Sequence, residues 1–122
     1  MYEITIPLLG FDEIKNVKLE KVDDYFSTLI LDKENLINFT IVNIKYLQHA
    51  AFDFNIEDEI LEKMHIRARE DFDIYFSVVL QDPIEKSIVN LVAPILINKR
   101  HNLIGQYIIK DKIPKLFTNL RE

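Results

Sequence analysis

Alternation of apolar and polar side chains is the dominant pattern of this chain, and it predicts short β-strands. The clearest run covers residues 72–80, where every second side chain is large and apolar. Similar patterns predict further strands at residues 2–6, 17–19, 25–31, 36–42, 87–98 and 103–109. The polar cluster at residues 32–35 indicates that the strands on either side of it form a β-hairpin.

One segment departs from this alternation and predicts a helix that begins near Asn55. Apolar side chains recur there at the spacing of one helical face. Asn55 is a favourable N-cap, acidic residues follow it, and basic side chains within residues 65–69 suit the negative end of the helix dipole. A second short helix is expected after Pro114.

Two residues indicate where the backbone turns. Gly10 follows the first strand and is expected to adopt a positive φ in a turn. Pro94 interrupts the strand pattern at 87–98, and a proline inside such a pattern belongs at an edge or a bulge, so we expect a bend there. Because strands follow strands with one short helix inserted, we expect a mostly-β fold. The expected architecture is an antiparallel, barrel-like or sandwich-like sheet in a single domain spanning residues 1–122.

The composition excludes several classes of function. The 122-residue chain has a formal net charge of −5, which disfavours duplex nucleic acid as a primary partner because such binders need a basic face. The absence of cysteine excludes disulfides and thiolate metal sites, and two glycines rule out a Gly-rich phosphate loop. No apolar stretch approaches the roughly 20 residues that span a bilayer, and no signal peptide is visible. We therefore expect a cytoplasmic protein.

Residues capable of metal binding or catalysis are scattered along the chain. Glu62 and His65 have the spacing of half a di-iron site, but such sites need that motif twice. His49, His65 and His101 lie in three separate contexts and form no triad order. We interpret them as surface residues, and we expect no catalytic residue, no metal and no cofactor.

The start of the predicted helix is strongly acidic, with a cluster formed by Asp53, Glu57, Asp58, Glu59 and Glu62. The favoured interpretation is helix N-terminal charge together with a solvated face. Paired carboxylates for acid–base catalysis are a second interpretation. A third is an acidic docking patch for a basic partner.

Several segments along the chain resemble a single known family. Residues 82–98 read D-P-I-E-K-S-I-V-N-L-V-A-P-I-L-I-N, which is similar to the signature of the FliW family of flagellar assembly factors. The matching positions in this segment are Asn90, Leu91, Ala93, Pro94, Ile97 and Asn98. Further matches in the same order are the turn at Gly10 and Phe11, residues 37–43, residues 52–54, and Gly105 with Gln106.

The resemblance implies a regulatory protein that works by binding and not by catalysis. Members of the family bind flagellin in the cytoplasm, and they also bind CsrA, the small RNA-binding repressor of flagellin translation. Free FliW sequesters CsrA and permits flagellin synthesis, whereas accumulated flagellin occupies FliW and releases CsrA. The implied partners are flagellin and a CsrA-type regulator, with no direct contact to nucleic acid or membrane. We expect a monomer.

Two candidate partner-binding surfaces follow from residues near the predicted helix. Tyr46, Phe52 and Phe54 are expected to be surplus exposed apolar side chains that line a groove for the amphipathic helices of flagellin. The acidic docking patch for the basic regulator consists of Glu57, Asp58, Glu59 and Glu62.

The sequence leaves two questions open. Asn90, Pro94 and Asn98 recur at every fourth position, where they either lock neighbouring loops by hydrogen bonds or form a contact surface. The alternative to a binding module is a small β-barrel that binds a ligand or acts as an enzyme. A barrel interior packed with Phe, Ile and Leu favours the binding module, and an empty interior lined by Asp, His or Asn favours the alternative.

Overall fold

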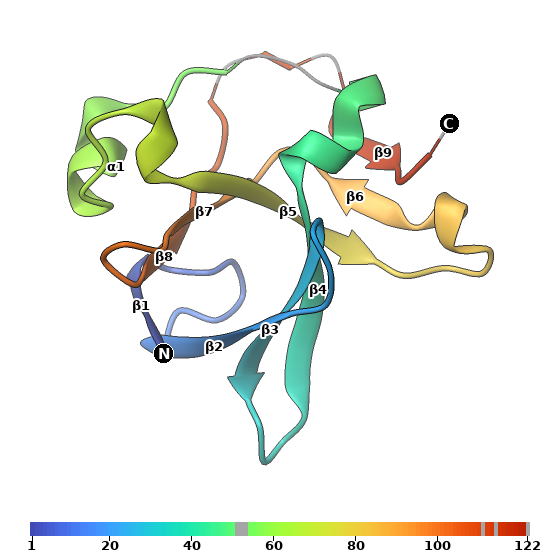
Figure 1. Cartoon of the computed structure of the whole chain (residues 1–122), viewed down its shortest axis with the longest axis horizontal. Helices are drawn as coiled ribbons and strands as arrows, with labels where there is room; N and C mark the ends of the chain where they lie inside the picture. The colour runs from blue at the N-terminus through green and yellow to red at the C-terminus, as the bar shows by residue number, and fades with distance from the viewer. Residues whose placement is uncertain (51–53, 111, 114, 122) are drawn as a thin grey trace.

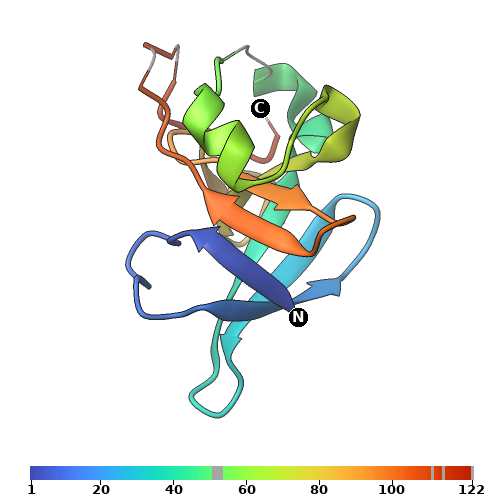
Figure 2. The ribbon, with the colours of Figure 1, turned by 90° about the vertical axis from the view of Figure 1, so that its left-hand side faces the viewer.

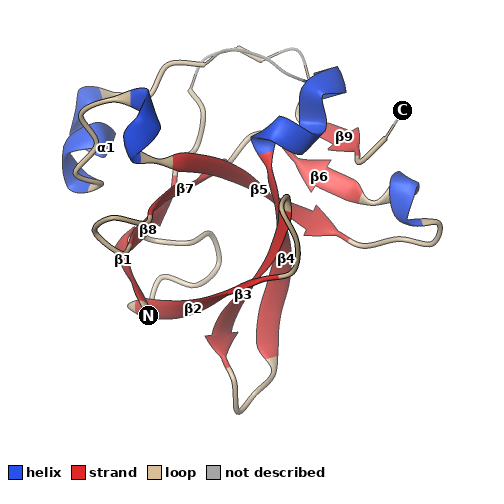
Figure 3. Cartoon of the chain, viewed as in Figure 1, coloured by secondary structure: helices blue, strands red, loops and turns tan. Residues whose placement is uncertain are grey.

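The computed structural model describes residues 1–50, 54–110, 112–113 and 115–121. Strands dominate these residues, and with one short α-helix, α1 (Asp58–Lys63), they confirm the predicted mostly-β class (Figure 3). The strands are β1 (Tyr2–Ile6), β2 (Asn16–Lys21), β3 (Phe26–Asp32), β4 (Ile37–Asn43), β5 (Asp73–Val79), β6 (Ile88–Asn90), β7 (Ile95–Asn98), β8 (Leu103–Gln106) and β9 (Phe117–Asn119). The 3-10 helices are η1 (Ile44–Ala50), η2 (Arg69–Asp71) and η3 (Ile84–Lys86).

Seven of the strands close into a barrel. Neighbours in the order β4-β3-β2-β1-β8-β7-β5 are hydrogen-bonded, and β4 also pairs with β5 to complete the ring (Figure 1). Every neighbouring pair in the ring is antiparallel except β1 with β8, which run parallel. The predicted barrel is therefore confirmed, with one parallel contact that the pattern of strands did not indicate. Beyond the ring, β6 pairs with β5 and β9 pairs with β6.

Apolar side chains pack the barrel interior. The interior cluster takes side chains from all seven barrel strands, and its buried members are Leu8, Val17, Leu29, Ile41, Tyr75, Ile95, Ile97 and Ile104. Because Leu, Ile and Val fill this interior, the barrel meets the condition that favours a binding module over a barrel that encloses a ligand.

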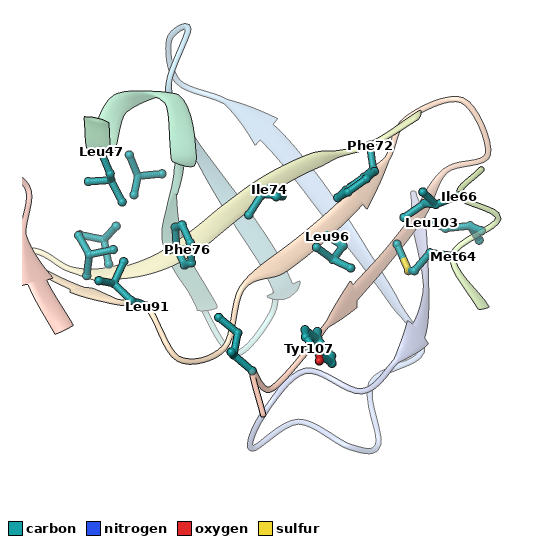
Figure 4. Packing of buried hydrophobic residues seen from close by; sticks show 14 of the residues in the cluster. Leu47, Met64, Ile66, Phe72, Ile74, Phe76, Leu91, Leu96, Leu103 and Tyr107 are labelled. Carbon is teal, nitrogen blue, oxygen red and sulfur yellow. The ribbon is translucent and has the colours of Figure 1, made fainter. Parts of the chain in front are cut away.

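A second apolar cluster covers the outer face of β4, β5, β7 and β8. Leu96 and Leu103 lie there near Met64, which follows α1, whereas Phe76 lies farther along β5 toward Leu47 and Leu91 (Figure 4). The helix lies over β7 and β8 (Figure 2). Tyr75 belongs to the interior cluster whereas Phe76 belongs to the outer one, so β5 is buried on both faces. The hydrophobic core therefore lies on both sides of the sheet that forms the barrel wall.

The hairpin and the first turn agree with the sequence. The predicted strands at 25–31 and 36–42 correspond to β3 and β4, which pair antiparallel. Gly10 has a φ of 83°, as expected for the turn. Two predicted strands are longer than the observed ones, because β8 ends at Gln106 and Leu80 lies beyond β5, where it is 54% exposed.

The helix begins later than predicted. Its N-cap is Glu57, so the prediction that Asn55 caps it is wrong. The backbone carbonyl of Asn55 accepts a hydrogen bond from Tyr107 Oη at 3.3 Å, which ties this residue to the barrel instead of to the helix. The helix ends just before His65, whose φ of 55° lies in the left-handed region that often terminates helices.

The prediction of one continuous strand at residues 87–98 is wrong. The structure has two strands there, β6 and β7, separated by residues 91–94. Pro94 lies at the end of this break, which confirms the predicted bend. Both halves pair with β5, through Val78 with Val89 and through Tyr75 with Ile95. The chain therefore turns a corner at residues 91–94, where it enters the barrel.

The predicted short helix after Pro114 is wrong, because residues 117–119 form β9, antiparallel to β6. Thr118 and Leu120 are buried whereas Phe117 is exposed, so this segment has the two-residue period of a strand. The edge of β6 that faces away from β5 supplies the hydrogen-bond partners, and this tertiary contact outweighs the local helical tendency.

Candidate functional site

Several of the FliW-like motif residues hold the corner at residues 91–94 in place. The side-chain Oδ1 of Asn90 accepts a hydrogen bond from the Val92 amide at 2.9 Å. The Pro94 carbonyl accepts a hydrogen bond from the Tyr107 amide at 2.9 Å. Leu91 and Ala93 are buried, so these residues form part of the packed wall and present little surface to a partner.

Gln106 connects this corner to the first turn of the chain. Its Nε2 donates a hydrogen bond to the Ala93 carbonyl at 3.0 Å, and its Oε1 accepts one from the Leu9 amide at 2.7 Å. The next residues along the chain are Gly10 and Phe11, and the Phe11 ring stacks on Phe39 at a centroid distance of 6.4 Å. Two motif segments far apart in the sequence are therefore joined through one buried amide.

Asn98 joins the end of α1 to the turn between β7 and β8. Its side chain is 1% exposed, and its Nδ2 donates hydrogen bonds to the carbonyls of Met64 at 2.8 Å and His65 at 3.3 Å. Its Oδ1 accepts a hydrogen bond from the His101 amide at 3.2 Å. For Asn90, Pro94 and Asn98, these bonds support the interpretation that they lock loops and a bend.

Pro94→Ala is expected to lower the free energy of unfolding by about 1 kcal/mol. Position 94 lies outside both strands and uses only its carbonyl in the hydrogen bond to Tyr107, so the missing proline N–H has no structural cost. Alanine would lose the fixed φ that favours the bend. Urea denaturation measures the change, and a clear gain in stability would show that the proline is kept for a reason other than folding.

A charged pocket of about 700 Å³ opens where α1, η2 and the β7–β8 turn meet. Buried Asn98 lines this pocket, together with His65 and His101, whose ring centroids lie 5.3 Å apart. Asp71 also lines it, and its Oδ2 accepts hydrogen bonds from the backbone amides of Arg67 at 2.9 Å and Ala68 at 3.0 Å. These two hydrogen bonds lower the pKa of Asp71 below its usual value.

The acidic patch, consisting of Glu57, Asp58, Glu59 and Glu62, is exposed along α1 and its N-cap. Glu57 Oε1 forms an ion pair with Lys110 Nζ at 3.0 Å, and this hydrogen-bonded carboxylate raises the pKa of Lys110. Glu59 Oε1 pairs with Lys63 Nζ at 3.3 Å. Asp58 and Glu62 have no ion pair among the described residues, and both line the charged pocket. The patch therefore keeps part of its charge available to a partner.

The apolar candidates Tyr46 and Phe54 are half-buried and pack against the outer cluster, so the prediction that they are surplus exposed side chains is wrong. The Tyr46 ring contacts Phe26 at a centroid distance of 5.0 Å, and the guanidinium of Arg121 lies 3.9 Å from its centroid. Phe52 falls outside the described residues.

A larger apolar surface lies elsewhere, around β6 and β9. Its members are Val79, Ile88 and Phe117, which are exposed by 42–61% and lie on the neighbouring strands β5, β6 and β9. Val79 pairs with Ile88 across the strands, and Ile88 and Phe117 line a shallow pocket of about 490 Å³. Sequence reasoning missed this apolar surface because it depends on β9, which was expected to be a helix.

His65 and His101 lie side by side in the charged pocket, with ring centroids 5.3 Å apart, so the prediction that these two histidines lie in separate contexts is wrong. Among residues 1–50, 54–110, 112–113 and 115–121, no three His, Asp or Glu side chains are arranged to hold a metal ion. Glu62 and His65 are both exposed, while Asp53 and the side chain of His49 lie outside the described part of the chain. None of the helices in that part combines the length and apolar character needed to cross a bilayer.

Fold and surfaces together define a small closed β-barrel with a packed interior and with its charged and apolar surfaces on the outside. The family model described as FliW protein matches residues 1–118. The chain therefore belongs to the FliW family of flagellar assembly factors.

Individual relatives agree with this assignment. The flagellar assembly factor FliW 2 of Helicobacter hepaticus is 40% identical over 80% of this chain and 70% of its own length. The flagellar assembly factor FliW of Sulfurimonas denitrificans is 29% identical over 90% of this chain and 86% of its own. A crystal structure of the flagellar assembly factor FliW superposes with a TM-score of 0.84 at 25% identity, covering 98% of this chain and 84% of that one.

Proposed function

We propose that this protein is a cytoplasmic regulator that binds flagellin and a CsrA-type RNA-binding repressor, and so couples the level of flagellin to its translation. The observation that carries the proposal is the family match over residues 1–118, in a chain whose barrel superposes on a solved FliW structure. The packed interior supports a function carried by outer surfaces. Two competing binding equilibria are sufficient for such a circuit, and no catalytic step is needed.

The acidic patch is the proposed site for the regulator. An RNA-binding regulator carries a basic face, and complementary charge speeds encounter and fixes orientation. Asp58 and Glu62 form no ion pair among the described residues, so they are available for this contact. Contact at this site need not cover the RNA-binding face, because binding elsewhere also changes RNA affinity when the two sites are coupled.

The apolar surface around β6 and β9 is the proposed site for flagellin. Unassembled flagellin termini carry amphipathic segments whose apolar faces need cover, and such segments bind apolar grooves. The shallow pocket between Ile88 and Phe117 offers a place for one large apolar side chain. This assignment replaces Tyr46 and Phe54, whose rings are largely occupied by contacts within the protein.

Two variants are expected to lose different partners. Replacing the acidic patch by amides (Glu57→Gln, Asp58→Asn, Glu59→Gln, Glu62→Gln) should weaken regulator binding about tenfold at low salt and less at high salt, because salt screens exposed charges. Phe117→Asp should weaken flagellin binding about tenfold or more, since it places a charge in an apolar contact. Isothermal titration calorimetry with each purified partner measures both effects.

Each variant has a control within the same experiment, because the partner it should not affect reports on folding. A second set of four amides at exposed acids away from α1 removes the same charge; its members are Asp12→Asn, Glu13→Gln, Glu34→Gln and Glu85→Gln. If both amide sets weaken regulator binding equally, the effect of the acidic patch is due to net charge alone and not to a specific contact. If the wild-type protein binds neither partner at micromolar concentration, the proposed function is wrong.

A further inference from the structure

The charged pocket has an acidic wall on α1 and a second wall that carries two arginines together with Asp71. Arg67 and Arg100 lie on one side, following α1 and in the β7–β8 turn, and Asp58 and Glu62 lie on α1. Neither guanidinium forms a hydrogen bond or an ion pair among the described residues, and neither do the two carboxylates. Asp71 is the fifth charged side chain of the pocket: its Oδ2 accepts hydrogen bonds from the backbone amides of Arg67 and Ala68, and its carboxylate attracts Arg100 without forming an ion pair. The charges of Arg67, Arg100, Asp58 and Glu62 therefore remain without an ion-pair partner among the described residues.

The backbone that carries these groups is fixed. Asn98 bonds the carbonyls of Met64 and His65 on one side and the amide of His101 on the other, so the end of α1 and the β7–β8 turn are held together. Asp71 accepts two amide hydrogen bonds, which uses one of its oxygens and fixes the backbone at Arg67. The charged walls thus stand on a preformed scaffold, which reduces the entropic cost of binding.

We propose that this pocket is the second half of the regulator site, and that it receives an acidic side chain of the regulator between Arg67 and Arg100. The inference rests on the proposed function, because it takes the acidic patch as the site for the basic regulator. The patch and the pocket share Asp58 and Glu62, so a partner seated on the patch reaches the two arginines. The complementary surface is therefore a mixed-charge segment of protein, with a carboxylate close to a lysine or arginine.

The chemistry favours a carboxylate over a phosphate. A guanidinium matches either group through paired hydrogen bonds. A nucleic-acid backbone carries a continuous row of negative charges, however, and Asp58 and Glu62 would repel it from the same pocket. A polypeptide segment with alternating signs satisfies both walls at once. Such a pattern also sets the register of the complex, because a shifted partner would place like charges together.

The test compares two double variants in binding to the regulator and to flagellin. Arg67→Gln/Arg100→Gln removes the guanidiniums, and Lys33→Gln/Lys86→Gln removes the same charge at exposed lysines outside the pocket. We expect the arginine variant to bind the regulator about tenfold or more weakly, mainly through faster dissociation, and to bind flagellin as the wild type does. The lysine variant should bind the regulator within about twofold of the wild type or slightly more tightly, because the regulator's own face is basic.

Arg67→Lys/Arg100→Lys separates charge from geometry, since lysine keeps the charge and loses the fork of paired donors. Partial recovery of regulator binding is expected. Unchanged melting temperatures would show that the variants fold, as expected for exposed side chains that form no ion pair among the described residues. Regulator binding by the arginine variant equal to that of the wild type overturns the inference and leaves the proposed function standing. Absence of regulator binding by the wild type overturns both.

Discussion

Phe76→Ala should lower the free energy of unfolding by about 3–5 kcal/mol, the largest effect expected of any substitution considered for this chain. Phe76 is fully buried in the outer cluster, and it lies on β5, which is covered on both faces. Removing the ring loses its transfer free energy and leaves a cavity that the rigid barrel wall can fill only in part. Because domains of this size are stable by only about 5–15 kcal/mol, the variant should be close to unfolding at ordinary temperature.

Chemical denaturation followed by circular dichroism measures this loss, and the chain provides a matched control. Phe117→Ala makes the same chemical change at a side chain that is 55% exposed, and it should alter stability far less. Equal melting of Phe76→Ala and the wild type would mean that the outer face of β5 has been assigned wrongly.

Gly105→Val should lower the free energy of unfolding by about 3 kcal/mol. A Cβ at position 105 would lie 3.0 Å from Ile6 Cβ and 3.0 Å from Met64 Sδ, tighter than ordinary packed contacts, so Ile6 and Met64 would have to shift. Met64 follows α1 and its Sδ also lies 3.0 Å from Thr5 Oγ1, so a displaced Met64 would move the end of the helix and the charged pocket beside it.

The sign of the Gly105 effect is informative, because β-propensity alone predicts the opposite result. Valine is favoured over glycine in strands, and it also reduces the entropy of the unfolded chain. A graded series in which Gly105→Ala loses less stability than Gly105→Val would support the steric explanation. A variant more stable than the wild type would show that Ile6 and Met64 can move aside without cost.

The alternation of apolar and polar residues was sufficient to predict most strands of the barrel. It was not sufficient to predict the contact between β1 and β8 or the strand β9. The alternation in β3, β4 and β5 is regular because each strand presents apolar residues to a packed face, so the period-two signal is strong. The parallel contact between β1 and β8 joins residues about a hundred positions apart, and no local pattern encodes such a pairing. β9 is only three residues long, and its conformation depends on the edge of β6.

In the candidate sites, too, the sequence predicted the features that depend on local residues and did not predict those that depend on distant contacts. The exposure of Glu57, Asp58, Glu59 and Glu62 could be predicted, because acidic residues near the start of a helix are almost always solvated. The burial of Tyr46 and Phe54 could not, because it depends on contacts with Phe26, Arg121 and the outer cluster that are distant in the sequence. Arg67 and Arg100 come from separate segments, and only the folded chain places them in one pocket.

Displacement of the regulator by flagellin tests the central proposal most directly. Purified flagellin is titrated into a preformed complex of this protein with the CsrA-type regulator, and the regulator's binding to a labelled flagellin mRNA leader is followed by fluorescence anisotropy. We predict that flagellin releases the regulator and that RNA binding recovers in proportion. Simultaneous binding of both proteins, with RNA binding unchanged at saturating flagellin, would contradict it.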